Sequence, residues 1–271
     1  MKNNQKVVLI TGASSGMGRT TAAYLAKQGY VVYAGSRTPE KLFDIRSESI
    51  HPLKLDITNA QSIEETVSKI DKIDILINNA GYGLVSTVEE VTEEEMFNQF
   101  NVNVFGVMRM CKAVIPKMRK QKSGVIINIS SFLGKIGLPL LTFYNASKYA
   151  VEGITDSLRY ELRDFNIRVH SIMPGFFDTN FARDNLVTNQ ATFSEASPYA
   201  SMVSSLAPII VDQINNGNDT IEVSKLILEI IEESSFLARC TAGDKAKKFI
   251  PMKRELSDED FERRVRAYYA L

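Results

Sequence analysis

The sequence predicts an α/β fold in which a parallel β-sheet is covered by helices on both faces, giving three α/β/α layers. Apolar, β-branched runs of strand length alternate along the chain with patterns of helical period. The runs are apolar almost throughout, which is typical of parallel strands buried on both faces. The 271 residues contain no repeat, low-complexity segment or linker, so we expect a single domain, residues 1–271.

The same patterns place the elements in order. Strands are expected at residues 6–11, 30–35, 52–58, 74–79, 125–130 and 167–175. Helices are expected at residues 17–28, 60–70 and 93–120, and another begins at Phe143.

The last third of the chain is less regular. Residues 175–219 form a long connection, and such connections are usually lids or binding loops, so we expect a substrate-loop insertion there. Residues 257–271 predict an amphipathic helix with Ser257 as N-cap, because Phe261 and Val265 follow acidic residues at helical spacing.

Composition excludes several classes of function. Lysine plus arginine equals aspartate plus glutamate, 32 of each, so no net field attracts nucleic acid or an anionic membrane. With two distant cysteines and only two histidines, a metal site or a Ser-His-Asp triad is hard to assemble. No apolar run reaches the length of a signal sequence or a membrane span. We therefore expect a reduced, cytoplasmic protein that binds no metal.

Tyr144 and Lys148 suggest a proton-transfer site. They are four residues apart on a predicted helix, so they should share one face. A phenol has a pKa of about 10, and a nearby ammonium group favours the phenolate and lowers that pKa. Ser131, which follows the strand at 125–130, could add a third hydrogen-bonding group. A chance pairing on a helix is the alternative, unless the chain also binds a reactant.

A glycine-rich turn offers a place for that reactant. Gly12, Gly16 and Gly18 follow the first strand and open the first helix. Glycines let the backbone approach a pyrophosphate closely, and the helix N-terminus presents unpaired N–H groups to it. The position between a strand and a helix therefore favours a dinucleotide site.

The end of the second strand indicates which dinucleotide is bound. Ser36 and Arg37 stand where an NAD-type site has a carboxylate for the ribose 2′-hydroxyl. A hydroxyl and an arginine fork suit a 2′-phosphate, so we expect NADP(H) in preference to NAD(H); a solvated arginine is the alternative. Asp56 lies too far along the chain to bind the ribose, and should reach the adenine edge or cap the next helix.

Together these motifs resemble those of the short-chain dehydrogenase/reductase family, in its short, single-domain branch. The likeness runs from Val7 to about Thr179. Its motifs are Thr11-Gly-Ala-Ser-Ser-Gly-Met-Gly18, Asp56, Asn78-Asn-Ala-Gly81, Asn103, Ser131, Tyr144-Asn-Ala-Ser-Lys148 and Pro174-Gly-Phe-Phe-Asp-Thr179. The resemblance implies a doubly wound Rossmann sheet, an NAD(P)(H) cofactor and hydride transfer to or from a carbonyl or secondary alcohol.

The resemblance also implies the site residues. The catalytic set would be Asn103, Ser131, Tyr144 and Lys148. The cofactor would contact Gly12, Ser14, Ser15, Gly16, Met17, Gly18, Ser36, Arg37, Asp56, Ile57, Asn79, Tyr144, Lys148, Pro174, Gly175 and Thr179.

In that scheme each catalytic residue has its own role. Tyr144 exchanges a proton with the substrate oxygen, and Ser131 holds the same oxygen. Lys148 lowers the pKa of Tyr144 and binds the nicotinamide ribose. Asn103 kinks its helix so that a backbone carbonyl can hold a water. Phe177 departs from the smaller residue usual in the family, which puts the packing around the nicotinamide in doubt.

Beyond Thr179 the chain resembles the subgroup of 17β-hydroxysteroid and retinol dehydrogenases, which act on bulky apolar alcohols and ketones. Phe132, Leu133 and residues 137–141 could form an apolar wall for such a substrate, or could be ordinary core. A small-molecule substrate of this kind is the expected partner.

Assembly is the other property that the resemblance implies. In relatives, the long helix at 93–120 and the Tyr144 helix pair across a two-fold axis, so we expect a homodimer or homotetramer. The apolar face of the long helix would comprise Phe100, Val104, Met108, Cys111 and Ile115, although some of these must face the chain's own sheet.

The leading hypothesis is therefore an NADP(H)-dependent oxidoreductase acting on a hydrophobic small molecule. A non-catalytic NADP(H)-binding regulatory protein is the alternative, although it would need only the cofactor half of the site. A nucleotide-sugar epimerase or dehydratase is a third hypothesis, but that branch of the family is longer and has a different glycine spacing.

Overall fold

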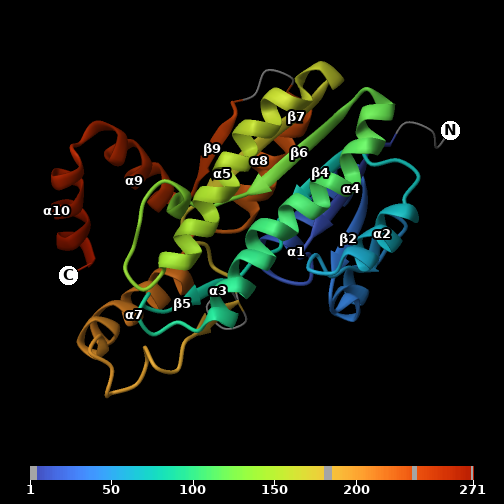
Figure 1. Ribbon diagram of the computed structural model, residues 1–271. Helices are drawn as coiled ribbons and strands as arrows, with labels where there is room; N and C mark the ends of the chain where they lie inside the picture. Colours follow the sequence, from blue (N-terminus) through green and yellow to red (C-terminus); the bar gives the residue numbers. More distant parts are fainter. Residues whose placement is uncertain (1–4, 180–184, 234–236, 270) are drawn as a thin grey trace.

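Seven parallel strands form the central sheet of the computed structural model, which describes residues 5–179, 185–233, 237–269 and 271. The strands are β1 (Val7–Thr11), β2 (Val31–Ser36), β3 (Ile50–Lys54), β4 (Ile75–Asn78), β6 (Gly124–Ile129), β7 (Ile167–Pro174) and β9 (Arg239–Ala242). Their order across the sheet is β3-β2-β1-β4-β6-β7-β9. The chain runs outward in both directions from β1 and β4, which confirms the predicted doubly wound parallel sheet (Figure 1).

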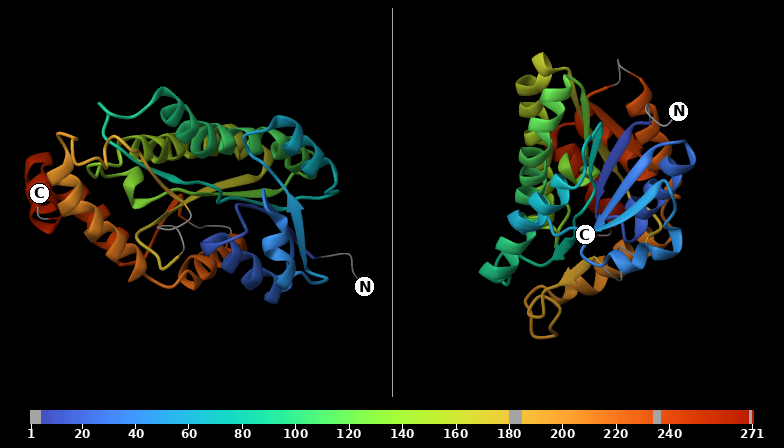
Figure 2. Two further views of the ribbon diagram at one scale, coloured as in Figure 1. Left: turned by 90° about the horizontal axis from the view of Figure 1, so that it is seen from below. Right: turned by 90° about the vertical axis from the view of Figure 1, so that its right-hand side faces the viewer.

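Helices cover both faces of this sheet (Figure 2). One face carries α1 (Gly16–Lys27) and α8 (Ile221–Glu232), and the other carries α2 (Ala60–Ser68), α4 (Gly106–Gln121) and α5 (Thr142–Leu162). Successive side chains of a strand alternate between the two cores, so Ile10 packs under the first pair and Leu9 under the other three. The predicted three layers are therefore present.

Strand β3 begins and ends earlier than the sequence predicts. It pairs with β2 from Ile50 to Lys54, so Asp56 lies beyond the strand. The strand is at the edge of the sheet, where Pro52 is tolerated because an edge strand does not need every N–H for pairing.

The long helix predicted at 93–120 is interrupted. It consists of α3 (Glu93–Phe100), a π-helical turn at Asn101–Phe105 and α4. A π turn adds a residue to the helix and shifts the register of everything after it. As a result, Val104 and Cys111 are buried in the chain's own core while Met108 is half exposed. The prediction that these three share one assembly face is wrong.

The connection expected at 175–219 contains regular structure. Strand β8 (Leu186–Thr188) pairs in parallel with β5 (Gly83–Val85), and α7 (Ala200–Asn215) follows. The buried side of α7 carries Leu206, Ile210 and Ile214. Part of the expected insertion, residues 180–184, lies outside the described residues.

The described C-terminal residues form α9 (Asp244–Glu255) and α10 (Asp258–Tyr269), at the end of the molecule away from the N-terminus (Figure 1). Ser257 accepts a hydrogen bond at 3.1 Å from the backbone N–H of Asp260, as an N-cap does. Phe261 and Val265 are buried, so the predicted amphipathic helix is confirmed over its described part. Among the described residues, no helix is both long and apolar enough to cross a membrane.

Candidate active site

The residues expected to be catalytic come together beyond the carboxyl end of the sheet. Ser131 follows β6, Tyr144 and Lys148 lie on α5, and Asn103 lies in the π turn. Beside them is a cavity of about 80 Å³. Its lining is mainly apolar and comprises Met17, Gly83, Ser130, Ser131, Phe132, Leu133, Leu141, Tyr144, Pro174, Gly175, Phe176, Phe177, Thr179, Leu186, Ile210 and Ile214.

A larger groove lies elsewhere on the molecule. It measures about 900 Å³ and runs between α7, α10 and residues 136–139. None of the residues predicted for catalysis or cofactor binding is part of its described lining. The segment at 137–141, expected as one apolar wall, is divided: Leu141 lines the small cavity, while Gly137 and Pro139 line the larger groove.

Ser131 connects the turn after β6 to Tyr144. Its side chain makes a hydrogen bond with the Tyr144 side chain. Its Oγ also accepts a hydrogen bond at 3.1 Å from the N–H of Leu133, and so caps the short 3₁₀ turn η3 (Phe132–Gly134). Ser130 points differently, because its hydroxyl donates to the backbone oxygen of Lys148 at 3.5 Å. The two adjacent serines therefore make different contacts.

Lys148 is buried beneath the site. Its Nζ donates a hydrogen bond at 2.9 Å to the backbone oxygen of Ile129 and lies 5.7 Å from the centre of the Tyr144 ring. Burial lowers the pKa of Lys148 to about 8, and the Glu152 charge acts in the opposite direction.

The pKa of Tyr144 corrects an expectation. Burial raises it to about 12, and the hydrogen bond with Ser131 acts in the opposite direction. The sequence led us to expect a lowered pKa because Lys148 is near. In the protein alone, the loss of hydration dominates, because burial disfavours the charged phenolate.

The π turn places the Asn103 side chain between two segments. Its amide donates to the backbone oxygen of Tyr82 at 2.9 Å and to the Ser147 hydroxyl at 3.1 Å. Its Oδ1 accepts from the N–H of Tyr82 at 3.1 Å. The helix is thus distorted where a kink was expected. The Asn103 side chain links Tyr82, which precedes β5, to Ser147 on α5.

The glycine-rich loop has the shape that a pyrophosphate needs. Gly12 and Gly16 have positive φ angles of 66° and 50°. A Cβ on Gly12 would lie 2.7 Å from Ala80 Cα, and one on Gly18 would lie 2.4 Å from the oxygen of Gly12. The amide of Asn79 donates to the oxygens of Thr11 and Gly12, both at 3.0 Å. Asn79 therefore fixes the loop through its side chain.

The rest of the loop leads into α1. Ser14, Ser15 and Met17 are half-buried around its N-terminus. In the described structure the N-cap residue, Ser15, makes no side-chain hydrogen bond to the first turn. The first N–H groups of α1 are thus left to bind an anion, which fits a dinucleotide pyrophosphate.

Ser36 and Arg37 lie beside this loop, at the end of β2. Strand β2 pairs with β1 up to Thr11 and Gly35, and the N–H of Ala13 donates to the oxygen of Gly35 at 3.0 Å. Arg37 is exposed, and the Ser36 hydroxyl accepts a hydrogen bond from the N–H of Thr38 at 3.1 Å.

Asp56 does not cap the helix after it. Its Oδ1 accepts hydrogen bonds from the N–H and the hydroxyl of Thr58, at 2.8 and 2.7 Å. The N-cap of α2 is Asn59, whose side chain accepts from the N–H of Ser62 at 3.0 Å. The helix-cap alternative for Asp56 is therefore wrong. Ile57 is buried and packs against Gly106, where an added Cβ would lie 2.5 Å away.

The segment after β7 closes the other side of the site. Gly175 packs against α9, since an added Cβ would lie 3.0 Å from the nitrogen of Ala246. The methyl group of Thr179 would be 3.3 Å from a Cβ on Gly16, so the segment meets the glycine-rich loop. Phe177, which is larger than the residue usual in the family, lines the cavity and is only 3% exposed. Its ring is accommodated in the core beside Gly243.

Sequence reasoning expected a substrate loop at residues 175–219 but did not identify which of its residues line the cavity. Leu186 comes from β8, and Ile210 and Ile214 come from α7. The available signal was the four-residue spacing of Leu206, Ile210 and Ile214, which is helical. Within the described ranges, no three His, Cys, Asp or Glu side chains are grouped so as to hold a metal ion.

Comparisons with known proteins agree with this geometry. The family described as short chain dehydrogenase matches residues 6–190, so the chain belongs to that family. It is 38% identical over 271 residues, 98% of both chains, to a 3-ketodihydrosphingosine reductase from Bacteroides thetaiotaomicron.

Solved structures are similar over nearly the whole chain. A short-chain dehydrogenase from Streptomyces avermitilis has a TM-score of 0.83 and 29% identity, with 99% of this chain and 97% of that chain covered. Another from Burkholderia cenocepacia, in complex with NADP, has a TM-score of 0.76 and 26% identity, with both chains fully covered. As a member of the family, the chain is an NAD(P)-dependent oxidoreductase that acts on CH–OH groups.

Proposed function

We propose that the protein transfers hydride between NADP(H) and a carbonyl or secondary alcohol in an apolar small molecule. One arrangement supports this most strongly: the hydrogen-bonded Ser131–Tyr144 pair faces an apolar cavity beside the glycine-rich loop. When bound, the nicotinamide would supply or accept the hydride.

The chain's own residues would handle the proton. In the reducing direction the Tyr144 hydroxyl donates its proton to the carbonyl oxygen, and Ser131 donates a hydrogen bond to the same oxygen. A charged Lys148 stabilises the phenolate that forms on Tyr144 and offers its ammonium to the nicotinamide ribose. In the oxidising direction the proton returns to Tyr144.

The cofactor would lie along the edge made by β1, β2 and β4. Its pyrophosphate would meet the N-terminus of α1, where Gly12 and Gly18 have no room for side chains. Exposed Arg37, with Ser36, would hold the 2′-phosphate of NADP(H), for which NAD(H) has no counterpart. The related dehydrogenase from Burkholderia cenocepacia was solved with NADP, which supports the assignment.

The cavity wall and a relative that covers 98% of the chain support a proposal for the substrate class. Phe132, Leu186 and Ile214 surround the site with apolar groups. The relative is named a 3-ketodihydrosphingosine reductase, and such a substrate joins a ketone to a long alkyl chain. We infer that this protein reduces a 3-keto group close to an alkyl chain.

The test is a screen of NADPH oxidation against 3-keto sphingoid bases, β-keto esters, steroids, retinoids and aliphatic aldehydes. We expect turnover of the 3-keto compounds that carry a long chain. Tyr144→Phe should abolish it while leaving NADPH binding almost intact, because only the hydroxyl touches the reacting oxygen. A fully active Tyr144→Phe variant would disprove the mechanism, and a wild type inert toward every carbonyl would favour a regulatory protein.

A further inference from the structure

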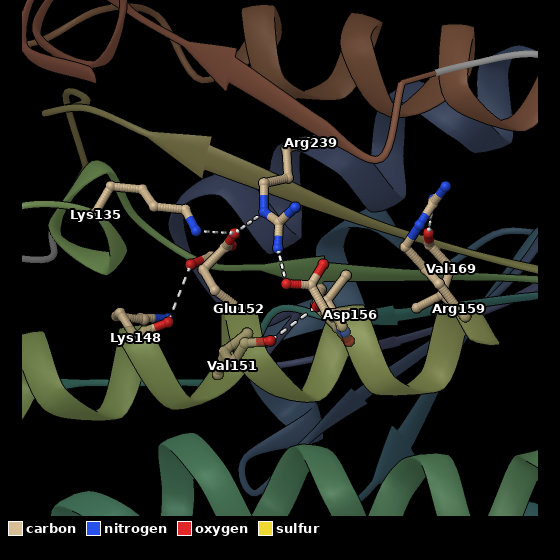
Figure 3. Close-up of polar contacts among 11 residues, drawn as sticks. Lys135, Lys148, Val151, Glu152, Asp156, Arg159, Val169 and Arg239 are labelled. Atoms are coloured by element: carbon tan, nitrogen blue, oxygen red, sulfur yellow. Dashed lines mark hydrogen bonds and ion pairs between the residues drawn. The ribbon is translucent and has the colours of Figure 1, made fainter. Parts of the chain in front are cut away.

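Glu152 is a buried carboxylate to which the mechanism above assigns no role. It lies on α5, one helical turn beyond Lys148, and only 2% of it is exposed. Figure 3 shows Glu152 and Asp156 projecting from α5 toward Arg239, with Lys148 one turn earlier on the same helix. Because side chains four residues apart on a helix are neighbours, the Glu152 carboxylate acts on the Lys148 ammonium as a nearby charge, without a direct ion pair between the two described side chains.

Cations from two other elements hold this carboxylate. Its Oε2 lies 2.6 Å from Nε of Arg239 on β9 and 3.6 Å from Nζ of Lys135, which follows η3. Arg239 also pairs with Asp156, which is about half exposed. Among the described residues, the second oxygen of Glu152, Oε1, is buried and has no hydrogen-bond partner. One of the two oxygens is thus held and the other is left without compensation in a buried place.

The turn that carries Ser131 is packed against the same point. An added Cβ on Gly134 would lie 3.0 Å from the backbone oxygen of Lys148 and 3.2 Å from Cγ of Glu152. The next residue, Lys135, pairs with Glu152. The turn after β6 and the helix with Tyr144 and Lys148 are therefore joined at Glu152.

We propose that Glu152 is a positioning residue that offsets the charge of Lys148 and fastens the Ser131 turn to α5. A buried ammonium has lost most of its hydration, and a nearby carboxylate restores part of the lost stabilisation. The proposal rests on the proposed function, because Lys148 must stay charged there to bind a ribose and to stabilise the phenolate.

The direction of each electrostatic effect is clear. Burial lowers the pKa of Lys148, and Glu152 raises it. The cations Arg239 and Lys135 partly neutralise Glu152, so they weaken its effect on the pKa of Lys148. Asp156 partly neutralises Arg239 in turn. Removing the Glu152 charge should therefore make Lys148 lose its proton at a lower pH.

The test compares Glu152→Gln, which keeps the shape and removes the charge, with Asp156→Asn as the matched control. NADPH binding would be followed by fluorescence between about pH 6 and pH 10, together with turnover. Binding and turnover should decline above a certain pH, at which Lys148 loses its proton. In Glu152→Gln this pH should be lower by about one unit, because one partly neutralised charge a helical turn away has been removed. Asp156→Asn should keep the wild-type value. Since binding is read without turnover, an error in the proposed substrate does not affect this result.

Two further variants sharpen the outcome. Glu152→Asp keeps the charge and should keep the wild-type pH profile. Arg239→Gln removes the cation that neutralises Glu152, so the pH above which binding and turnover decline should rise. This variant decides the test if Glu152→Gln does not fold. The proposal would be overturned if folded Glu152→Gln keeps the wild-type pH profile. It would also be overturned if the pH of decline falls or stays the same in Arg239→Gln, because a purely structural carboxylate affects the melting temperature alone.

Discussion

Nζ of Lys148 lies 5.7 Å from the centre of the Tyr144 ring, one turn apart on the same face of α5. Burial pushes both groups toward their neutral forms, raising the pKa of Tyr144 to about 12 and lowering that of Lys148 to about 8. A phenolate–ammonium pair thus needs further stabilisation from the site when the reaction occurs.

The two adjacent serines should differ sharply in their effect on rate. Ser131→Ala removes a donor from the reacting oxygen and should lower kcat by about 100- to 1,000-fold. Ser130→Ala is the matched control, because Ser130 contacts the backbone oxygen of Lys148, and should lower stability slightly with little effect on kcat. Equal losses of kcat in the two variants would contradict the assignment.

Lys148 should reduce the stability of the protein at neutral pH. Its pKa is about 8 in the fold against an ordinary 10.5. Between those values the unfolded chain binds more protons, so the free energy of unfolding should rise with pH there. Below pH 8 the full penalty applies.

Lys148→Met should therefore raise the melting temperature at pH 7 and abolish turnover, with a gain on the order of 1–3 kcal/mol. Lys120→Met, at an exposed lysine on α4, serves as the control. Thermal unfolding of both variants at pH 7 and pH 10 measures the effect. A Lys148→Met protein less stable than wild type at pH 7 would show that the contact with Ile129 outweighs the burial penalty.

Gly18→Ala should prevent cofactor binding. The added Cβ would lie 2.4 Å from the oxygen of Gly12 and 2.5 Å from Nδ2 of Asn79, so the loop would have to move. Gly153→Ala is the control, because nothing lies within 4 Å of a Cβ there and alanine favours a helix. Calorimetric titration with NADPH should show binding lost in the first variant and unchanged in the second.

Arg37→Asp should weaken NADPH binding selectively. Losing a charge-assisted phosphate contact corresponds to about 1.5–3 kcal/mol, or roughly 10- to 150-fold in Kd. NADH should bind almost as before, and the exposed Arg254→Asp, with the same change of charge, should affect neither ligand. Equal affinity of the wild type for NADH and NADPH would contradict the preference.

We propose that the protein forms a homodimer or homotetramer through α4 and α5. Phe105 in the π turn, Met108 on α4 and Tyr149 on α5 are 40%, 50% and 46% exposed, which is unusual for large apolar side chains. Met108→Asp should shift the molar mass measured by light scattering toward the monomer. A wild type that is monomeric at micromolar concentration would exclude the assembly.

Local patterns in the sequence were sufficient for six of the seven strands of the sheet and for most of the helices that cover it, but they did not predict β9 or α8. Strand propensity and a helix that follows a glycine-rich turn depend on neighbouring residues, so β1 and α1 could be predicted closely. Local patterns did not indicate the π turn, and only the family resemblance suggested a kink at Asn103, because its side chain bonds to the backbone of Tyr82 and the hydroxyl of Ser147, which are distant in sequence. Helix α7 was missed because Pro208 lies within it and its apolar side is defined by what packs on it.

The sequence by itself determined which chemical groups the site contains: the serine, the tyrosine, the lysine and a loop with no room for side chains. Tertiary structure alone decided their electrostatic state. The pKa of Tyr144 rises rather than falls because burial depends on residues from the turn after β6, from β7 and from α7, which line the same cavity. Likewise, Glu152 pairs with Lys135, which precedes it in the sequence, and with Arg239, which follows it much later. Desolvation and charge pairing act through space, so neither leaves a local pattern in the sequence.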